Sequence, residues 1–312
     1  MLRDLRATDA TAVIEFLKAD FPEENAILGI RPEGVEEIVR RLFRWYARLL
    51  LGLMRAVGRP VFRFFVIEDG GRIVATTLLS FPPGAGYVSS VVVDPAHRRR
   101  GLARRLLEEA RRAAARRGRP FVVLDVLESN TPARALYESL GYRLLRTTAY
   151  LVHDAPGDAP TPSPAPLGIR PFARSDADPL AAIAQRTAPP EVARILPVRA
   201  REIVGSGWVE QMMRADSQAW VVDRGRGPEA HLSATVSPAT ESGHLSAPIV
   251  APEADPAAAE GLVRTAVAWF AARGVRRSVV MVPEENRRGR AALEAVGYRH
   301  AIAILTLYRP VA

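Results

Sequence analysis

Residues 91–103 read VVVDPAHRRRGLA, and this stretch decides the fold. The valines predict the end of a β-strand, and the arginine-rich amphipathic run after Gly101 predicts a helix. Gly101 and Ala103 keep side-chain bulk low where the helix begins, so main-chain N–H groups can close on an anion with the help of the helix dipole. The sequence therefore predicts a pyrophosphate site at this helix N-terminus, from which a larger residue at Gly101 would hold the phosphates away.

A second motif follows the helix that we expect over 102–117. An apolar strand is expected over 121–126, and the segment 130–142 then reads NTPARALYESLGY. Its first residue, Asn130, is also a good helix N-cap. Capping is the structural alternative to a role in binding, and both roles can hold together.

Both motifs, in this order and at this spacing, resemble those of the GCN5-related N-acetyltransferase (GNAT) family. The family's pyrophosphate pattern is Gln or Arg, two residues, Gly, one residue, then Gly or Ala, and Arg98 to Ala103 matches it. The family also carries an Asn, an Ala-x-x-Leu-Tyr helix and a Gly-Tyr or Gly-Phe step at the place of the second motif. The resemblance implies an α/β (α+β) fold, in which a mixed, mostly antiparallel sheet splays open after its fourth strand and is flanked by helices.

The resemblance also implies a cosubstrate, acetyl-CoA, and no metal. Main-chain groups of Val91 and Val93 would align the pantetheine arm along the splayed strand. The coenzyme-binding residues that the resemblance implies are Val91, Val93, Arg98, Arg99, Arg100, Gly101, Leu102, Ala103 and Asn130.

Acetyl transfer to an amine needs a base for the nucleophile and a proton for the departing thiolate. The resemblance implies that Tyr137 is the general acid; its structural alternative is a packed aromatic ring. For the base we favour Asp125 on the expected fifth strand, where relatives similar to ribosomal-protein alanine acetyltransferases carry a glutamate. Glu68 and Glu128 are rivals, and each of the three carboxylates has a pairing with an arginine as its alternative. We expect His97 to be structural.

The second half of the chain repeats the first. Residues 168–178 echo 2–10, and residues 279–298 echo 122–142, with the same distance from Asn to Gly in both copies. This pattern predicts an internal duplication. We predict a catalytic GNAT domain over 1–153 that binds acetyl-CoA, a proline-rich linker over 154–167 and a second GNAT-like domain over 168–312. The tandem arrangement is similar to that of mycothiol synthase.

The second copy is predicted to be degenerate. Where the first copy has its arginine- and glycine-containing loop, residues 250–260 read VAPEADPAAAE. Glu253 and Asp255 would repel a pyrophosphate, and Pro256 removes an N–H donor. Leu293 stands in the place of Tyr137. We therefore expect residues 168–312 to lack a pyrophosphate loop and to shape the acceptor pocket or stabilise the first domain.

Composition agrees with a soluble enzyme that binds an anionic cofactor. The 312 residues carry a formal charge of +9, and the absence of cysteine excludes disulfides, thiolate metal sites and an acyl-cysteine intermediate. The N-terminus does not resemble a signal peptide, and the apolar run 49–54 is too short to span a bilayer, so we expect a cytoplasmic protein without membrane contact. The basic stretches lack interleaved aromatic residues, and we do not expect nucleic acid as a partner.

The function predicted from these features is acetyl-CoA-dependent N-acetylation of a primary amine, on a small molecule or a peptide, by direct attack in a ternary complex. The alternative is a non-catalytic acyl-CoA-binding regulatory module. Residues 21–59 would wall the acceptor site, with Phe43, Trp45 and Tyr46 either in a lid or in the core. The acceptor, the acyl chain and the oligomeric state are not predicted.

Overall fold

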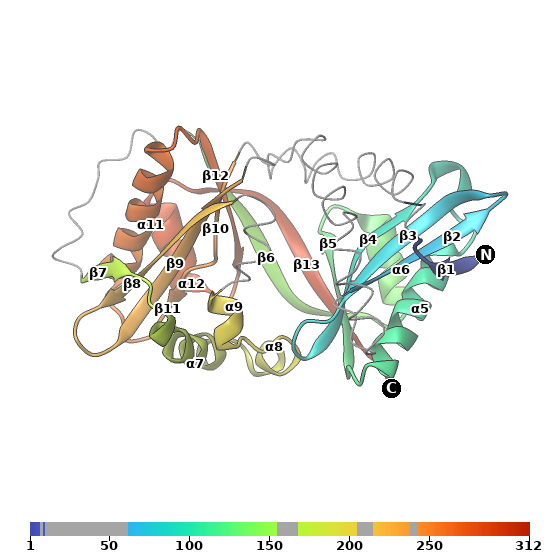
Figure 1. Cartoon of the computed structure of the whole chain (residues 1–312), viewed down its shortest axis with the longest axis horizontal. Helices are drawn as coiled ribbons and strands as arrows, with labels where there is room; N and C mark the ends of the chain where they lie inside the picture. Colours follow the sequence, from blue (N-terminus) through green and yellow to red (C-terminus); the bar gives the residue numbers. More distant parts are fainter. Residues whose placement is uncertain (7–8, 10–61, 155–167, 205–214, 238–241) are drawn as a thin grey trace. The chain divides into compact units, whose positions relative to one another are not determined.

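A computed structural model describes residues 1–6, 9, 62–154, 168–204, 215–237 and 242–312 (Figure 1). The predicted acceptor wall at 21–59 and residues 155–167 of the predicted linker lie outside these residues. Asp154, expected to begin the linker, instead ends a β-strand. The described chain divides into two compact units. Unit 1 comprises residues 1–6, 9, 62–145 and 305–312, and unit 2 comprises 146–154, 168–204, 215–237 and 242–304. No helix among the described residues is long and apolar enough to cross a membrane.

Unit 1 is built on a mixed sheet whose first four strands pair antiparallel in chain order. The fifth strand joins the fourth in parallel, which requires the helical crossover between them. The elements are β1 (Leu2–Asp4), β2 (Phe62–Asp69), β3 (Arg72–Ser80), β4 (Ala85–Val93), η2 (Pro95–His97), α5 (Leu102–Arg116), β5 (Phe121–Leu127) and α6 (Thr131–Ser139).

Helix α5 packs on one face of this sheet because its apolar side chains fall on one stripe (Figure 1). Leu106 and Leu107 are fully buried, while the arginines of the helix face away from the core. Gly86 of β4 permits the close approach, since a Cβ atom there would stand 2.9 Å from the Cβ of Ala114. This contact fixes the C-terminal part of α5 against the beginning of β4.

The last strand of the chain completes unit 1. Strand β13 (Arg299–Pro310) lies next to β5, and its residues from 305 onward belong to unit 1. Leu307 is buried in the core of unit 1, the Val311 N–H donates to the Pro120 carbonyl at 2.9 Å, and Arg309 pairs with Glu108 at 2.6 Å. The structure therefore divides the chain differently from the boundaries expected at residues 153 and 168.

Strand β6 (Arg143–Asp154) belongs to unit 2 from Arg146 onward. It pairs antiparallel with β12 of the same unit, from Thr148 to Asp154. The other elements of unit 2 are β7 (Ile169–Pro171), η5 (Arg174–Asp176), α7 (Ala177–Thr187), α8 (Pro190–Ile195), α9 (Ala200–Val204), β8 (Asp216–Asp223), β9 (Pro228–Val236), β10 (Gly243–Leu245), β11 (Ile249–Val250), α11 (Pro256–Ala271), β12 (Arg277–Pro283) and α12 (Arg287–Ala295).

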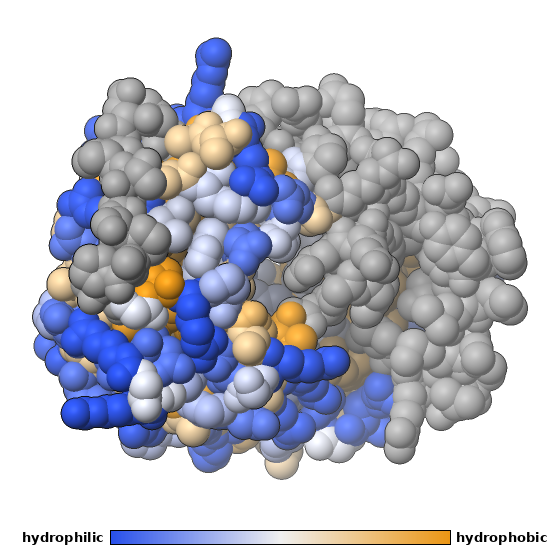
Figure 2. All heavy atoms as spheres, turned by 60° about the vertical axis from the view of Figure 1, so that its left-hand side comes forward, coloured by the Kyte–Doolittle hydropathy of each residue, from blue (hydrophilic) through white to orange (hydrophobic). Residues whose placement is uncertain are grey.

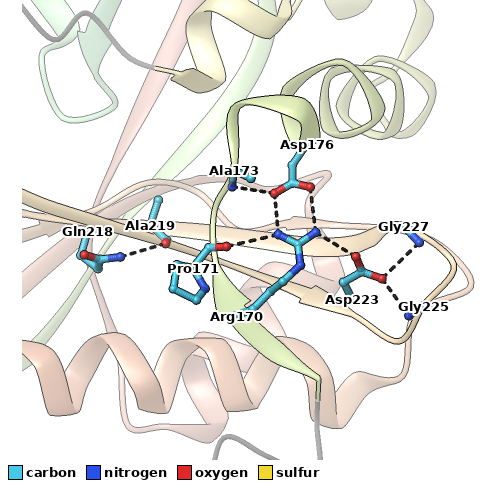
Figure 3. A network of polar contacts seen from close by, with 9 residues as sticks. All are labelled: Arg170, Pro171, Ala173, Asp176, Gln218, Ala219, Asp223, Gly225 and Gly227. Carbon is cyan, nitrogen blue, oxygen red and sulfur yellow. Dashed lines mark hydrogen bonds and ion pairs between the residues drawn. The ribbon is translucent and has the colours of Figure 1, made fainter.

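A matched polar network supports the internal duplication. In unit 2, Arg170 on the first strand binds both oxygens of Asp176 at 2.8 Å and also Asp223 at 2.8 Å (Figure 3). In unit 1, Arg3 on the first strand binds Asp9 at 2.6 and 3.0 Å and Glu68 at 2.9 Å. The aspartate stands six positions after the arginine in both copies.

The described residues on the face of unit 2 drawn in Figure 2 are largely hydrophilic. Viewed from its side, hydrophobic residues show only in small, separate areas among the described residues (Figure 2). Met281 is the one large hydrophobic side chain of described unit 2 that is strongly exposed, at 39%. The apolar residues of the repeat therefore build its core rather than a contiguous surface patch.

Candidate functional site

The N-terminus of α5 presents main-chain donors. Gly101 is the N-cap residue and adopts a left-handed conformation with φ of +74°. No side chain of the described residues caps this end, and the Arg105 N–H makes the first helical bond, to the Gly101 carbonyl at 3.1 Å. The preceding N–H groups of Leu102, Ala103 and Arg104 have no acceptor inside the helix. They are directed, with the positive end of the helix dipole, toward any anion placed there.

The loop before α5 is ordered by its own polar groups. The Asp94 side chain accepts from the Ala96 N–H at 2.8 Å, and this hydrogen bond lowers the pKa of the Asp94 carboxyl group. His97 lies 3.4 Å from the same carboxylate, in agreement with the structural role expected for it. Arg98, Arg99 and Arg100 are exposed, and so the loop is electropositive where the helix begins.

Strand β4 separates from β5 just before this loop. The two strands pair from Ala85 and Phe121 to Val88 and Leu124, and their pairing ends there. The register of β3 and β4 shifts after this point, and Ser90 has φ of +53°. A bulge of this kind bends a strand away from its neighbour. The predicted opening of the sheet after its fourth strand is confirmed.

The peptide groups of Val91 and Val93 face the opening. The Asp94 N–H donates to the Val74 carbonyl at 2.9 Å, and so Val93, one residue earlier, directs its peptide groups away from β3. The Val93 carbonyl accepts from Arg98 Nε at 3.2 Å, which confirms this direction. Alternation along the strand places Val91 in the same orientation. Both predicted pantetheine contacts thus line the edge of β4 that β5 leaves uncovered.

Asp125 lies at the point where the strands part. It follows Leu124, the last residue of β5 that pairs with β4, and its Oδ2 accepts a hydrogen bond from the Tyr87 hydroxyl. Its Oδ1 is buried and has no hydrogen-bond partner among the described residues. The sequence did not reveal Tyr87, although parallel pairing of β4 with β5 and the alternation of side chains would have placed it on the same face as Asp125.

The rival carboxylates have other surroundings. Glu68 of β2 pairs with Arg3 of the neighbouring strand β1. Its equivalent in unit 2 is Asp223, which pairs with Arg170. Glu128 is exposed beyond the end of β5. Of the three candidates, Asp125 alone stands at the opening of the sheet.

Helix α6 carries the other predicted residues. Asn130 caps it by accepting from the Ala133 N–H at 3.2 Å, and this capping role is compatible with a coenzyme contact by the same residue. Tyr137 is 7% exposed and packs 5.9 Å, centroid to centroid, from the ring of Tyr142. Burial raises the pKa of Tyr142, whose hydroxyl has no partner among the described residues.

Unit 2 differs from unit 1 at the N-terminus of its long helix and at the positions of Asp125 and Tyr137. Helix α11 is capped by its own Asp255, which accepts from the Ala257 N–H at 2.9 Å and pairs with Arg224 at 3.1 Å. The spacing to the capping asparagine places Met281 at the position of Asp125, and Leu293, fully buried, at the position of Tyr137. The described residues contain no cluster of three or more potential metal ligands.

Sequence comparison connects this geometry with known proteins. The profile of the Acetyltransferase (GNAT) family matches residues 13–142. The [ribosomal protein bS18]-alanine N-acetyltransferase of Escherichia coli strain K12 is 33% identical over 97 residues, which are 30% of this chain. The chain spans 66% of the length of that relative, just under two thirds.

Two solved structures resemble the whole chain. A tandem GNAT protein from the clavulanic acid biosynthesis pathway, without AcCoA, superposes with a TM-score of 0.66 at 19% identity, and the match covers 100% of this chain and 98% of that one. A GCN5-related N-acetyltransferase from Sphaerobacter thermophilus gives a TM-score of 0.66 at 17% identity, with 100% and 95% covered. At these identities the likeness concerns the fold alone, and it confirms the predicted tandem arrangement.

Proposed function

Because the chain belongs to the acetyltransferase (GNAT) family, we propose that it transfers the acetyl group of acetyl-CoA to a primary amine, and that unit 1 does so. Attack is direct, within a ternary complex of protein, coenzyme and amine. The observation that carries the proposal is the uncapped N-terminus of α5, which stands at the end of a strand that has left its neighbour. A diphosphate and a linear arm attached to it need these two features side by side.

Each part of the coenzyme has a matching group in unit 1. The diphosphate accepts from the main-chain N–H groups of the loop and first turn, with the exposed arginines adding positive charge. The pantetheine arm adds to the free edge of β4 at Val91 and Val93. Residues 98–103 and Asn130 are the remaining proposed coenzyme contacts. Main-chain recognition explains why Gly101 is placed at this point: its positive φ turns the chain into the helix without adding a side chain.

The chemistry assigns one proton acceptor and one proton donor. Asp125 takes a proton from the ammonium form of the acceptor, and the neutral nitrogen attacks the thioester carbonyl carbon. The C–N bond forms and the C–S bond breaks as the tetrahedral intermediate collapses. The thiolate that leaves receives its proton from Tyr137. The acylated nitrogen then gives its second proton to the Tyr137 phenolate, which leaves a neutral amide, and Asp125 releases the first proton to solvent. This assignment rests on the place of Asp125 at the opening and of Tyr137 in the matched motif.

Unit 2 has a different proposed role. Asp255 already satisfies the N-terminus of α11, and its carboxylate would repel a diphosphate. We therefore propose that unit 2 binds no coenzyme and that each chain holds one acetyl-CoA. The cytoplasm is the proposed compartment, where acetyl-CoA is available.

The test is acetyl-CoA turnover with a panel of amines, followed as thiol release. The panel includes small primary amines and peptides with a free N-terminus. One peptide begins with alanine, because the E. coli relative is an alanine N-acetyltransferase of ribosomal protein bS18. Tyr137→Phe is expected to release thiol at least tenfold more slowly while its affinity for coenzyme stays within twofold of that of the wild type. A wild-type protein that binds acetyl-CoA but releases no thiol with any amine would contradict the proposal and favour an acyl-CoA-binding regulatory module.

A further inference from the structure

The pair formed by Tyr87 and Asp125 bridges β4 and β5 at the last point where the strands are joined. Tyr87 lies opposite Val123 in the register, and its hydroxyl donates to Oδ2 of Asp125, two residues further along β5. The next rung, Val88 with Leu124, is the last one. The hydrogen bond therefore ties a β4 side chain to the first β5 residue beyond the paired region.

Both side chains lie on the face of the sheet opposite α5. Gly86 and Val88 of β4 face α5, since Gly86 lies against Ala114 and Val88 shares the buried core of that helix. Leu124 of β5 belongs to the same core. Because successive strand residues point to opposite faces, Tyr87 and Asp125 point away from α5.

The two oxygens of Asp125 differ. Oδ2 is held by the phenol, whereas Oδ1 is buried without a hydrogen-bond partner among the described residues. A buried carboxylate oxygen without a donor is unfavourable, and such groups are rare in folded proteins. An ammonium group supplies the missing donor and the opposite charge.

Unit 2 shows that the fold forms without this pair. Gly243 pairs with Ser278 in parallel, as Gly86 pairs with Val122, and both glycines lie against the long helix of their unit. His244 therefore stands in the place of Tyr87, and Met281 in that of Asp125. The pair occurs only in the unit whose helix N-terminus is open.

We propose that Tyr87 is a positioning residue, which holds Asp125 through Oδ2 so that Oδ1 faces the nitrogen of the acceptor amine. This assignment rests on the proposed function. The phenol has a single proton to donate, and that proton is engaged by Asp125. The thiolate therefore takes its proton from another group, which leaves the role of Tyr137 unchanged.

A double-mutant cycle tests the proposal. Tyr87→Phe removes only the hydroxyl and is expected to lower kcat/KM for the amine about 10- to 100-fold, the usual effect of losing a hydrogen bond to a charged group. Coenzyme affinity stays within twofold. In an Asp125→Asn background the same change has less than a twofold further effect, since Tyr87 acts through the carboxylate. Tyr298→Phe, which removes a buried hydroxyl hydrogen-bonded to the Ser278 hydroxyl in unit 2, is the matched control and retains full activity.

Three kinetic results would overturn the proposal. The first is an active Tyr87→Phe variant with unchanged kcat/KM. The second is a double variant in which the two fold-losses multiply. The third is an equal loss of kcat/KM in Tyr298→Phe. Multiplication would mean that Tyr87 acts independently of Asp125.

Crystal structures of wild type and Tyr87→Phe provide a readout that does not depend on turnover. The proposal predicts one conformation of Asp125 in the wild type and a rotated or multiple conformation in the variant. An Asp125 side chain that keeps its position without the phenol would refute the positioning role. If the wild type transfers no acetyl group, the proposed function fails, and these two structures still decide whether Tyr87 holds Asp125.

Discussion

Two glycines at the ends of α5 allow a direct test of the diphosphate site. Gly101 precedes the helix with φ of +74°, and Gly118 follows it with φ of +64°. A Cβ atom at either position would meet nothing within 4 Å. Replacement by alanine is therefore opposed by backbone strain alone in both cases. We expect each variant to lose about 1 kcal/mol of folding free energy, the cost of a left-handed conformation less the gain from a stiffer unfolded chain.

Only one of the two substitutions should affect the coenzyme. Relief of the strain in Gly101→Ala turns the N–H groups of the first turn away from the position of the diphosphate. The loss of one charge-assisted hydrogen bond corresponds to about 2 kcal/mol, or roughly 30-fold in affinity. Gly118→Ala changes the opposite end of the helix and should bind acetyl-CoA as the wild type does.

Titration calorimetry with acetyl-CoA measures the affinity, and thermal unfolding measures the stability of each variant. The matched losses of stability control for general damage to unit 1. If Gly101→Ala binds acetyl-CoA as tightly as Gly118→Ala does, the helix N-terminus is not the diphosphate site and the reasoning fails.

Three further predictions concern the framework. Burial lowers the pKa of His231 to about 4, so the folded state keeps the imidazole neutral and the free energy of unfolding falls as the pH drops from about 6.5 toward 4. Between pH 7 and 5, denaturant unfolding should show that His231→Thr loses about 2 kcal/mol less of its free energy of unfolding than the wild type does. Leu307→Ala should destabilise unit 1 by about 3 kcal/mol, because it empties part of the core. Deletion of residues 305–312 should abolish coenzyme binding. A deletion variant that binds coenzyme normally would show that β13 does not complete unit 1. The hydrogen bond from Arg170 lowers the pKa of Asp176, so the Asp176 carboxylate stabilises unit 2 at pH values above its ordinary pKa and loses this contribution as the pH falls. Asp176→Asn should lower the free energy of unfolding by about 2 kcal/mol at pH 7, measured by urea unfolding. An unchanged urea midpoint would contradict the role of the network.

The sequence was sufficient where local chemistry determines structure. Gly101 adopts a positive φ, a conformation that favours glycine at this position. Asn130 and Asn286 cap equivalent helices, as the repeat predicts. The echo of 2–10 in 168–178 is confirmed by the paired arginine networks. These features depend on residues close together in the chain, which is why their spacing could be interpreted.

Features that depend on distant residues could not be predicted in the same way. The alternation of apolar residues in 305–310 indicates a strand, but it does not specify the sheet that the strand joins. Its place beside β5 depends on the contacts of Leu307 and on the pair of Arg309 with Glu108. Tyr87 was missed for a related reason, because its role is visible only when the register of β4 and β5 is known.

The most direct test is a crystal structure of the wild-type protein with acetyl-CoA. We predict one coenzyme per chain, with its diphosphate on the N–H groups of Leu102, Ala103 and Arg104 and its arm along Val91 and Val93. Density for the diphosphate at the N-terminus of α11, or an empty α5 N-terminus at saturating coenzyme, would contradict the account.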